Sequence, residues 1–544
     1  MNGADALVAA LQAHGVTWIS TLCGHGLNEI FGACGRAGLR VVDTRNEQTA
    51  AYAAEAWGRL SGGVGVCAVS SGVAHANALT GVVNAHFDGS PMLLVTGSGP
   101  LSTAGQGHFQ DFDQVAMARP VCKYARALDR ADRVPEIVHE ALAAAVSGRP
   151  GPVHLTFPMD VQTEALSEAP STALAPVEDR LPSPAPEAVR RAAQLLAESR
   201  RPLIVAGSGV FYGGAGRDVA DFAAAWAVPC VVPIWDRGSV AEARPEYLGV
   251  VGAASGGPAL LQDADLVLML GAAADYRVGY LQSPALRADA AVIRVDVDPE
   301  RLHHMDRADL SVLAGPAPFL EALGDACAAA GTPGFEEWLA ETRRRRDEFD
   351  SSVRANPAAG ALRDSGLTGL EVCEAVAAEA PEEAVLIADG GNIGQWFHQT
   401  LGSRRYPGTW LTCGASGVVG YGVGAAMGAR LGFPRRPVVL LSGDGAATFN
   451  LTDLECAARQ DLPFVMIVAD DEAWGITLSG DLRAYGEPRS SGLGPFDFAA
   501  AAEACGALGA RVEETDHLRE ALRQGLRESR PVVLHVPIRG GLPA

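Results

Sequence analysis

The sequence predicts an α/β protein built from three doubly wound parallel-sheet domains. Apolar runs of strand length alternate with amphipathic helical segments almost throughout the chain, which is the pattern of parallel sheets covered by helices. At 544 residues the chain is too long for a single hydrophobic core, so about three domains are expected. Its hydrophobic fraction of 48% and charged fraction of 20% are ordinary for a soluble globular protein.

The first domain is expected at residues 1–161 and is followed by a linker. Residues 162 to about 186 are rich in Pro, Ala and Glu, a composition typical of connecting segments. Within the domain, short apolar segments predict strands at 18–21, 41–43, 65–69, 92–96 and 153–157.

The central domain is expected at 187–330. Apolar segments predict its strands within 202–209, 264–271 and 292–298. A strand followed by Gly207 and Gly209 resembles the start of a dinucleotide site, but the Gly-x-Gly-x-x-Gly spacing is not met, so cofactor binding here is the less favoured interpretation. The basic run that follows has acidic neighbours, which indicates a solvated helix face rather than a nucleic-acid site; it comprises residues 343–346.

The third domain is expected at 366–544 and carries the most informative motif of the chain. An apolar run, 437–441, leads to Asp444 between two glycines, and a second run, 463–469, leads to Asp471. A lone Gly-Asp-Gly is most often a turn. Here two parallel strands would present both acids at one sheet edge, with a helical stretch at 451–458 between them. Oxygen ligands in that position favour Mg²⁺.

This segment resembles the cofactor motif of thiamine diphosphate enzymes. The resemblance implies that Asp444, Asp471 and the carbonyl oxygen of Ala473 bind the metal. It departs from the family at Asp470, where Asn is usual, and the acid adds negative charge beside a site built for an anion.

Several residues are expected to contact the cofactor itself. Backbone N–H groups after Gly443 favour the diphosphate, because a helix starts there. A second loop, 388–394, resembles the other diphosphate loop of the family. The segment 417–424 resembles the one whose bulky side chain separates the two cofactor rings; a glycine-rich helix packed tightly on a sheet is its structural alternative. The predicted cofactor contacts are Gly390, Asn392, Val419, Gly443, Gly445, Ala446, Ala447, Trp474, Gly475 and Ile476.

Three side chains are candidates for catalysis. Glu47 lies where a strand gives way to an Ala-rich helix that should be buried, so it needs a hydrogen-bond partner or must lose its charge. Taken alone, it would be an acid interacting with the helix dipole. In similar enzymes a Glu here hydrogen-bonds N1′ of the aminopyrimidine and so activates the cofactor. By resemblance, His25 would transfer protons and Gln110 would contact cofactor and substrate, with His108 as a competing candidate.

The three-block plan resembles the acetolactate synthase and benzaldehyde lyase-like family over essentially the whole chain. The resemblance implies a carbon–carbon lyase or carboligase acting on small carbonyl substrates, 2-oxo acids or 2-hydroxy ketones. One alternative is a 2-hydroxyacyl- or oxalyl-coenzyme A lyase, which usually has a C-terminal lid; the short tail, 538–544, disfavours it. Another is a non-catalytic cofactor-binding subunit. FAD in the central domain stays open, because 273–279 only loosely resembles the flavin segment of some relatives.

Charge and cysteine content indicate which binding partners and which cell compartment to expect. A net charge of −21 argues against nucleic acid. The ten dispersed cysteines indicate buried thiols in a reducing compartment. No secretion signal or apolar stretch of about 18 residues is present, so a cytoplasmic protein without a membrane span is expected. The family resemblance implies a homodimer or homotetramer with active sites at the subunit interface.

Overall fold

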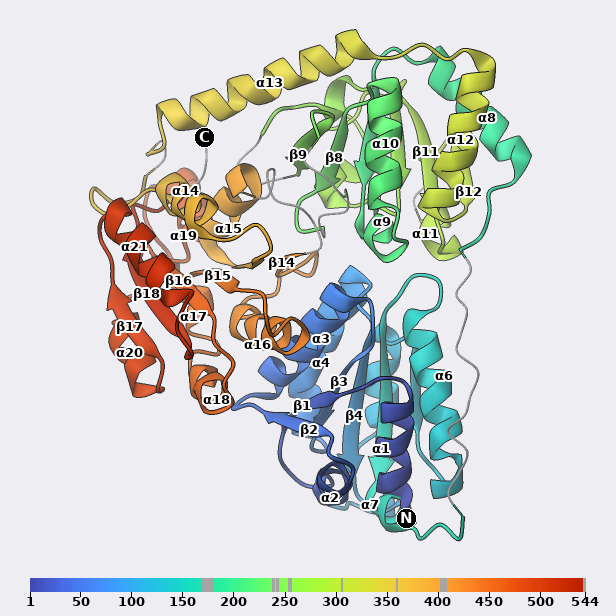
Figure 1. Cartoon of the computed structure of the whole chain (residues 1–544), viewed down its shortest axis with the longest axis vertical. Coiled ribbons are helices and arrows are strands. Elements are labelled where there is room, and N and C mark those ends of the chain that lie inside the picture. Colours follow the sequence, from blue (N-terminus) through green and yellow to red (C-terminus); the bar gives the residue numbers. More distant parts are fainter. Residues whose placement is uncertain are drawn as a thin grey trace.

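The protein contains three parallel sheets, each covered by helices (Figure 1). In the described part of the chain each sheet has six strands, all parallel, which confirms the predicted fold class. The computed structural model describes residues 1–168, 181–236, 240, 244–252, 257–304, 307–358, 361–401 and 409–541. Residues 169–180 of the predicted linker therefore lie outside the described residues.

The first sheet has the strand order β2-β1-β3-β4-β6-β5. Its central strands are buried on both faces, which explains their continuous apolar sequences. The strands are β1 (Trp18–Leu22), β2 (Arg40–Asp43), β3 (Gly65–Val69), β4 (Met92–Ser98), β5 (Tyr124–Ala127) and β6 (Pro152–Pro158). The helices are α1 (Gly3–Ala13), α2 (Asn28–Ala37), α3 (Glu47–Ser61), α4 (Val73–Asp88), α5 (Gln114–Ala118), α6 (Val134–Val146) and α7 (Met159–Thr163).

The central sheet has a different order, β12-β11-β10-β7-β8-β9. Its strands are β7 (Pro202–Ala206), β8 (Cys230–Pro233), β9 (Tyr247–Val251), β10 (Leu266–Leu270), β11 (Ala291–Asp296) and β12 (Leu310–Leu313). Its helices are α8 (Pro186–Glu198), α9 (Ser208–Tyr212), α10 (Gly216–Trp226), α11 (Pro299–His303) and α12 (Pro316–Ala330). The long helix α13 (Glu336–Ala355) then leads toward the third sheet (Figure 1).

The third sheet has the order β14-β13-β15-β16-β18-β17. Its strands are β13 (Val385–Asp389), β14 (Trp410–Thr412), β15 (Val438–Gly443), β16 (Val465–Asp470), β17 (Leu508–Arg511) and β18 (Val532–Pro537). Its helices are α14 (Gly369–Glu379), α15 (Gly391–Trp396), α16 (Gly422–Gly432), α17 (Asp444–Ala447), α18 (Asp453–Arg459), α19 (Gly475–Tyr485), α20 (Phe498–Ala504) and α21 (Thr515–Gly525).

Helix α16 packs directly on α3 and joins the first sheet to the third (Figure 1). A Cβ at Gly424 would lie 2.8 Å from the Thr49 carbonyl oxygen, and one at Gly428 would lie 2.2 Å from that of Ala53. Both glycines are therefore needed for this close approach. The glycine-rich segment therefore starts a tightly packed helix, as its structural alternative predicted. Helix α16 packs on α3 as well as on strands of the third sheet.

A buried charge cluster lies along the same joint. The Arg59 guanidinium is 3.5 Å from carboxylate oxygens of both Glu55 and Asp88, and all three side chains are almost fully buried. Arg59 Nη1 also donates to the carbonyl oxygen of Thr412 on β14, at 2.8 Å. Removing one partner of such a group would leave uncompensated charge in the core.

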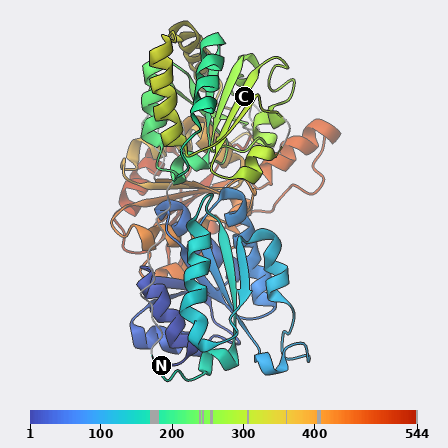
Figure 2. The ribbon, with the colours of Figure 1, turned by 90° about the vertical axis from the view of Figure 1, so that its right-hand side faces the viewer.

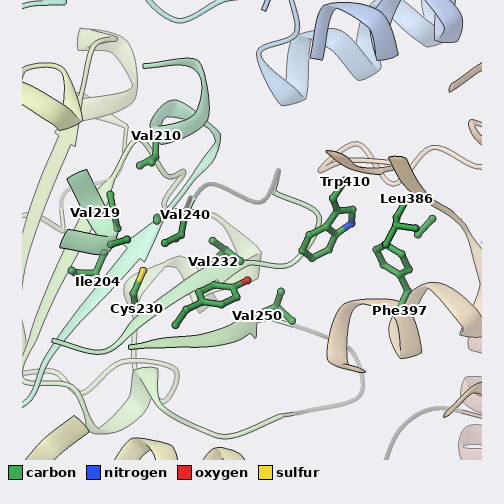
Figure 3. Packing of buried hydrophobic residues seen from close by; sticks show 14 of the residues in the cluster. Ile204, Val210, Val219, Cys230, Val232, Val240, Val250, Leu386, Phe397 and Trp410 are labelled. Carbon is green, nitrogen blue, oxygen red and sulfur yellow. The ribbon is translucent and has the colours of Figure 1, made fainter. Parts of the chain in front are cut away.

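The central and third sheets share a continuous hydrophobic core. Figure 3 shows Val232 and Val250 from the central sheet facing Trp410, with Leu386 and Phe397 beyond it. Turned by 90°, the molecule has the first sheet at one end and the central sheet at the other (Figure 2). The third sheet contacts both through these packed surfaces.

Some surface predictions need correction. The basic run lies on α13, but Arg346 is 7% exposed and donates to the carbonyl oxygen of Gln399, so it is not part of a solvated face. All ten cysteines are free, yet Cys23 is exposed rather than buried. In the described residues, no helix has the length and apolarity that crossing a membrane requires.

Candidate active site

Three aspartates, Asp444, Asp470 and Asp471, lie at or just after the ends of β15 and β16. The two strands pair with Gly443 opposite Ala469, so Asp444 and Asp470 follow side by side, and Asp471 comes next. Each of the three is at most 6% exposed. The strand ends predicted from the sequence thus bring the two predicted metal ligands to one sheet edge, as expected for open α/β folds.

Each carboxylate has its own hydrogen-bond partners. The Ala473 amide donates to Asp444 Oδ2 at 3.1 Å. Asn392 Nδ2 donates to Asp471 Oδ2 at 2.8 Å, which connects the predicted diphosphate loop 388–394 to a predicted metal ligand. Asp470 is held differently: His535 Nε2 lies 2.8 Å from its Oδ2, and the Glu472 amide donates to its Oδ1 at 3.0 Å.

The three carboxyl groups differ in pKa. Burial and the charge of Asp471 raise the pKa of Asp444 to about 8, and burial raises the pKa of Asp471 to about 6. Burial acts to raise the pKa of Asp470 too, but its hydrogen bonds, first with His535 and then with the Glu472 amide, together outweigh burial and leave the pKa below the usual value. The negative charge that the sequence placed at Asp470 therefore has a partner in the fold.

The donor set fits a divalent cation. Two buried carboxylates, next to a carbonyl and the unpaired Oδ1 of Asn392, lack a positive partner in the described structure and suit Mg²⁺. Over the described ranges, no three His, Cys, Asp or Glu side chains converge as a metal site. A cation would therefore also use backbone or ligand oxygens, which is how Mg²⁺ is usually held beside phosphates.

Glycines keep this sheet edge open. A Cβ at Gly391 would lie 3.1 Å from the Cα of Gly443, so the two diphosphate loops approach backbone to backbone. A Cβ at Gly475 would lie 2.1 Å from Asn392 Nδ2, and one at Gly445 would lie 2.6 Å from the Trp474 ring. These close approaches bring together most of the predicted cofactor contacts.

The remaining cofactor candidates flank this cradle. Gly390 has a φ of +57°, and a Cβ there would come 2.9 Å from that of Ala446. Ala447 is buried at the end of α17, whereas Ile476 is 39% exposed in the first turn of α19.

Val419 is positioned by an aspartate that the sequence interpretation did not assign. Asp389, at the end of β13, accepts hydrogen bonds from the amides of Gly420 and Gly422 at 3.1 and 2.8 Å. These bonds fix the turn that carries Val419. A Cβ built on Gly390 would lie 3.7 Å from Cγ1 of Val419. Val419 is thus held beside the same loop.

His25 and Gln110 come together at the carboxyl edge of the first sheet. The ring of His25 stacks on His108 at 5.4 Å and meets Phe109 edge-on at 5.3 Å. His25 Nε2 is buried without a hydrogen-bond partner among the described atoms. Gln110 has a φ of +55°, an uncommon value for a residue with a side chain, and accepts from Ser71 at 2.9 Å.

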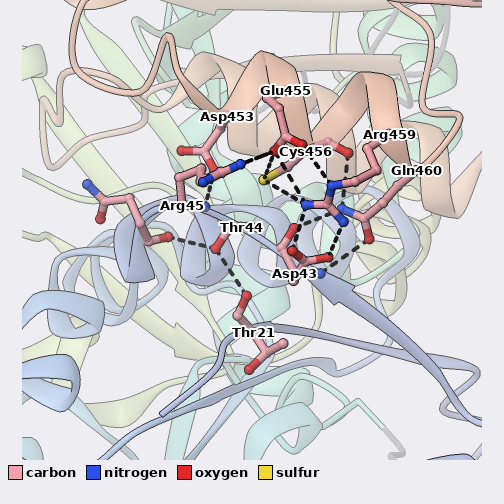
Figure 4. A network of polar contacts seen from close by, with 10 residues as sticks. Thr21, Asp43, Thr44, Arg45, Asp453, Glu455, Cys456, Arg459 and Gln460 are labelled. Atoms are coloured by element: carbon pink, nitrogen blue, oxygen red, sulfur yellow. Dashed lines mark hydrogen bonds and ion pairs between the residues drawn. The ribbon is translucent and has the colours of Figure 1, made fainter. Parts of the chain in front are cut away.

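Glu47 is half-buried at the start of α3 and has a hydrogen-bond partner. Asn77, one turn into α4, donates to Glu47 Oε2 at 2.7 Å. The start of α3 is further fixed on α18, because Arg45 N and Thr49 Oγ1 both donate to Asp453. Figure 4 shows the bond between Arg45 and Asp453, and the ion pair of Arg459 with Asp43 beside it.

The two sets of candidates occupy different sheet edges. His25, Glu47 and Gln110 follow strands of the first sheet, and the carboxylate cluster follows strands of the third. In the described structure of one chain, no hydrogen bond or ion pair joins a side chain of the first set to Asp444, Asp471 or Asn392.

Three segments of the chain match models of known protein families. Residues 1–117 match the model of the thiamine pyrophosphate enzyme N-terminal TPP binding domain. Residues 189–323 match the central domain of such enzymes, and residues 389–536 match their C-terminal TPP binding domain. Thiamine pyrophosphate is the cofactor also called thiamine diphosphate.

Relatives of two kinds align along nearly the whole chain. The 2-hydroxyacyl-CoA lyase 2 of Homo sapiens is 30% identical over 584 residues, covering 99% of this chain and 90% of that protein. The probable acetolactate synthase large subunit of Methanocaldococcus jannaschii is 28% identical over 557 residues, covering 99% and 92%. The chain belongs to the thiamine pyrophosphate enzyme family, as an acetolactate synthase-like member.

Proposed function

We propose that this thiamine diphosphate enzyme requires Mg²⁺ and acts as a carbon–carbon lyase or carboligase on 2-oxo acids or 2-hydroxy ketones. The observation that carries the proposal is the cluster of Asp444 and Asp471 at the glycine-lined edge of the third sheet. Asp444, Asp471 and the Ala473 carbonyl would hold the cation. When bound, the cofactor supplies a nucleophilic carbon and an electron sink for cleavage beside a carbonyl group.

The first sheet would supply the proton chemistry. Glu47, held by Asn77, is suited to hold a proton shared with the cofactor's pyrimidine ring. His25 has a free ring nitrogen for proton transfer to or from a substrate oxygen. Gln110 would orient that oxygen, and its strained backbone supports such a fixed role.

We assign the pyrimidine half of the cofactor to domain 1–161 and the diphosphate half to domain 366–544, with 187–330 between them. Because the two halves are separate within one chain, we propose a homodimer or homotetramer that pairs the first half of one subunit with the third-domain half of its partner. Exposed apolar side chains beside both halves support this: Val73 is 71% exposed, Phe109 62% and Phe449 51%. Ten free thiols support a cytoplasmic location.

A second candidate is cleavage of 2-hydroxyacyl-coenzyme A thioesters. A cavity of about 350 Å³ lies at the carboxyl edge of the central sheet, and its lining includes Arg149, Arg294, Arg301 and His304. The lining also includes Asp275, Asp298 and Glu300, so the support for coenzyme A phosphates comes from the three arginines and not from an overall positive charge. FAD in the same region has less support, because Arg277 of the flavin-like segment is buried and already bonded to Asp275.

Calorimetry and a substrate panel test both candidates. We expect the purified protein to bind thiamine diphosphate only with Mg²⁺, and to release CO₂ or an aldehyde from 2-oxo acids or acyloins. Turnover confined to 2-hydroxyacyl-coenzyme A substrates would favour the second candidate. Binding without turnover of any substrate would indicate a non-catalytic subunit, and no binding would contradict every enzymatic assignment.

A further inference from the structure

The carboxylate cluster contains one more acid than the proposed cation needs. Asp470 lies between Asp444 and Asp471 at the same sheet edge, and all three are buried. A third free carboxylate would repel an incoming diphosphate and compete with its neighbours for the cation. The direction in which Asp470 points therefore decides how the site works.

Both oxygens of Asp470 are already occupied. One accepts from the Glu472 amide at 3.0 Å and the other lies 2.8 Å from His535 Nε2. His535 lies on β18 opposite Val468, and Val468 and Asp470 share one face of β16. The bond with His535 thus ties one oxygen of the Asp470 carboxylate to β18, while the same carboxylate also lies within hydrogen-bonding distance of Asp444.

The imidazole ring of His535 is itself fixed. It is 1% exposed and meets the ring of Phe498 edge-on at 5.3 Å. Its second nitrogen, Nδ1, lies 4.0 Å from Asp497 Oδ1. A side chain with so little freedom can hold its partner in one orientation.

We propose that His535 is a positioning residue for the metal and diphosphate site. Its Nε2 offsets the charge of the Asp470 carboxylate and ties one of its oxygens to β18, so that Asp444 and Asp471 keep oxygens for the cation. This inference rests on the proposed cofactor site. Without the His535 donor, the Asp470 carboxylate beside Asp444 loses this compensation and opposes the diphosphate charge.

Variants of His535 test this role through cofactor affinity, without an activity assay. His535→Phe keeps the ring and removes the donor, so we expect thiamine diphosphate to bind about 10–100-fold more weakly at fixed Mg²⁺. His535→Gln keeps a donor near the Nε2 position and should bind almost as the unaltered protein does. Adding Asp470→Asn to His535→Phe removes the unpaired charge and should restore affinity. Affinity is measured by calorimetry.

Two controls separate this inference from the proposed site. Asp444→Asn should abolish cofactor binding, and normal binding by that variant would overturn the site itself. His517→Phe alters an exposed histidine on α21 and should change nothing. Unchanged affinity in His535→Phe, or a loss that Asp470→Asn does not restore, would overturn the positioning role. If His535→Phe fails to fold, the double variant must still fold and bind cofactor for the proposal to stand.

Discussion

The first and third sheets share one strand order but carry opposite chemistry at their carboxyl edges. β1, β3 and β4 occupy the same places in the first sheet as β13, β15 and β16 in the third. In the first sheet these strands lead to His25, Ser71 and, further along, Gln110. In the third, β15 and β16 lead to Asp444 and Asp471. Topology fixes where a ligand binds, and the loop residues decide what binds there.

The contrast extends to the partners that hold the functional side chains. On the first edge, side chains hold side chains: Asn77 holds Glu47, and Ser71 holds Gln110. On the third, backbone amides and glycine contacts form much of the site. We interpret the first edge as the place for proton transfer and the third as the place for anion and cation binding.

Replacing Glu47 tests this division most strongly. Glu47→Gln keeps the size of the side chain but removes its charge, so turnover should fall about 10²–10⁴-fold while cofactor affinity changes little. Steady-state kinetics and calorimetry on the same preparation measure both. Glu187→Gln, at an exposed first-turn acid of α8, is the matched control. Undiminished turnover in Glu47→Gln would contradict the assignment.

The joint between the two sheets gives the next largest effect. Arg59→Met leaves Glu55 and Asp88 buried without their cation, so the free energy of unfolding should fall by about 3–5 kcal/mol. Urea unfolding measures this loss. The control, Arg36→Met, removes an exposed ion pair with Asp5 and should cost about 0–1 kcal/mol. Equal losses in both variants would show that the buried cluster does not stabilise the joint.

Acid should weaken the first sheet through its buried histidines. Burial lowers the pKa of His75 to about 4, and the ring stacks on His154, whose pKa burial and the proximity of His75 also lower. The unfolded chain takes up protons at a higher pH than the folded chain, so the free energy of unfolding is at its full value above about pH 6.5 and falls toward pH 4. For His75 the loss is about 2 kcal/mol at pH 5.

His75→Phe removes one of these groups, so the unfolding midpoint should depend less on pH between 6.5 and 4. Thermal unfolding at several pH values measures the slope. His517→Phe, at an exposed histidine, should keep the original slope. If the unaltered protein, His75→Phe and His517→Phe all showed the same dependence of the unfolding midpoint on pH, the buried histidine pair would not be its cause.

The fold was predictable for many, but not all, strands whose segments are apolar on both faces. The buried strand β3 matches its prediction, whereas the buried strands β8, β9 and β14 were not identified, and neither were the edge strands β5, β12 and β17. Those edges are partly exposed, so their apolar pattern is interrupted. Edge strands of this kind need tertiary pairing to be recognised.

The candidate site was predictable in its motif residues but not in the residues that support them. Asp444 and Asp471 stand out because each follows an apolar strand. Asn77 and His535 have no such signal, since their partners are 30 and 65 residues away in the chain. Asp389 does end an apolar strand, but the turn that it binds begins 31 residues later. The excess charge at Asp470 was visible, but its compensation depended on a strand pairing that one sequence does not reveal.

The packing of α3 against α16 also sets the order in which the chain can finish folding. Arg59 and its acceptor Thr412 are 353 residues apart. At about 5–20 residues per second, roughly 20–70 s of synthesis separate them. Throughout that time the Ala-rich face of α3 lacks its cover, because its partner has not yet been made. The newly made first domain must therefore be shielded from aggregation until the third arrives.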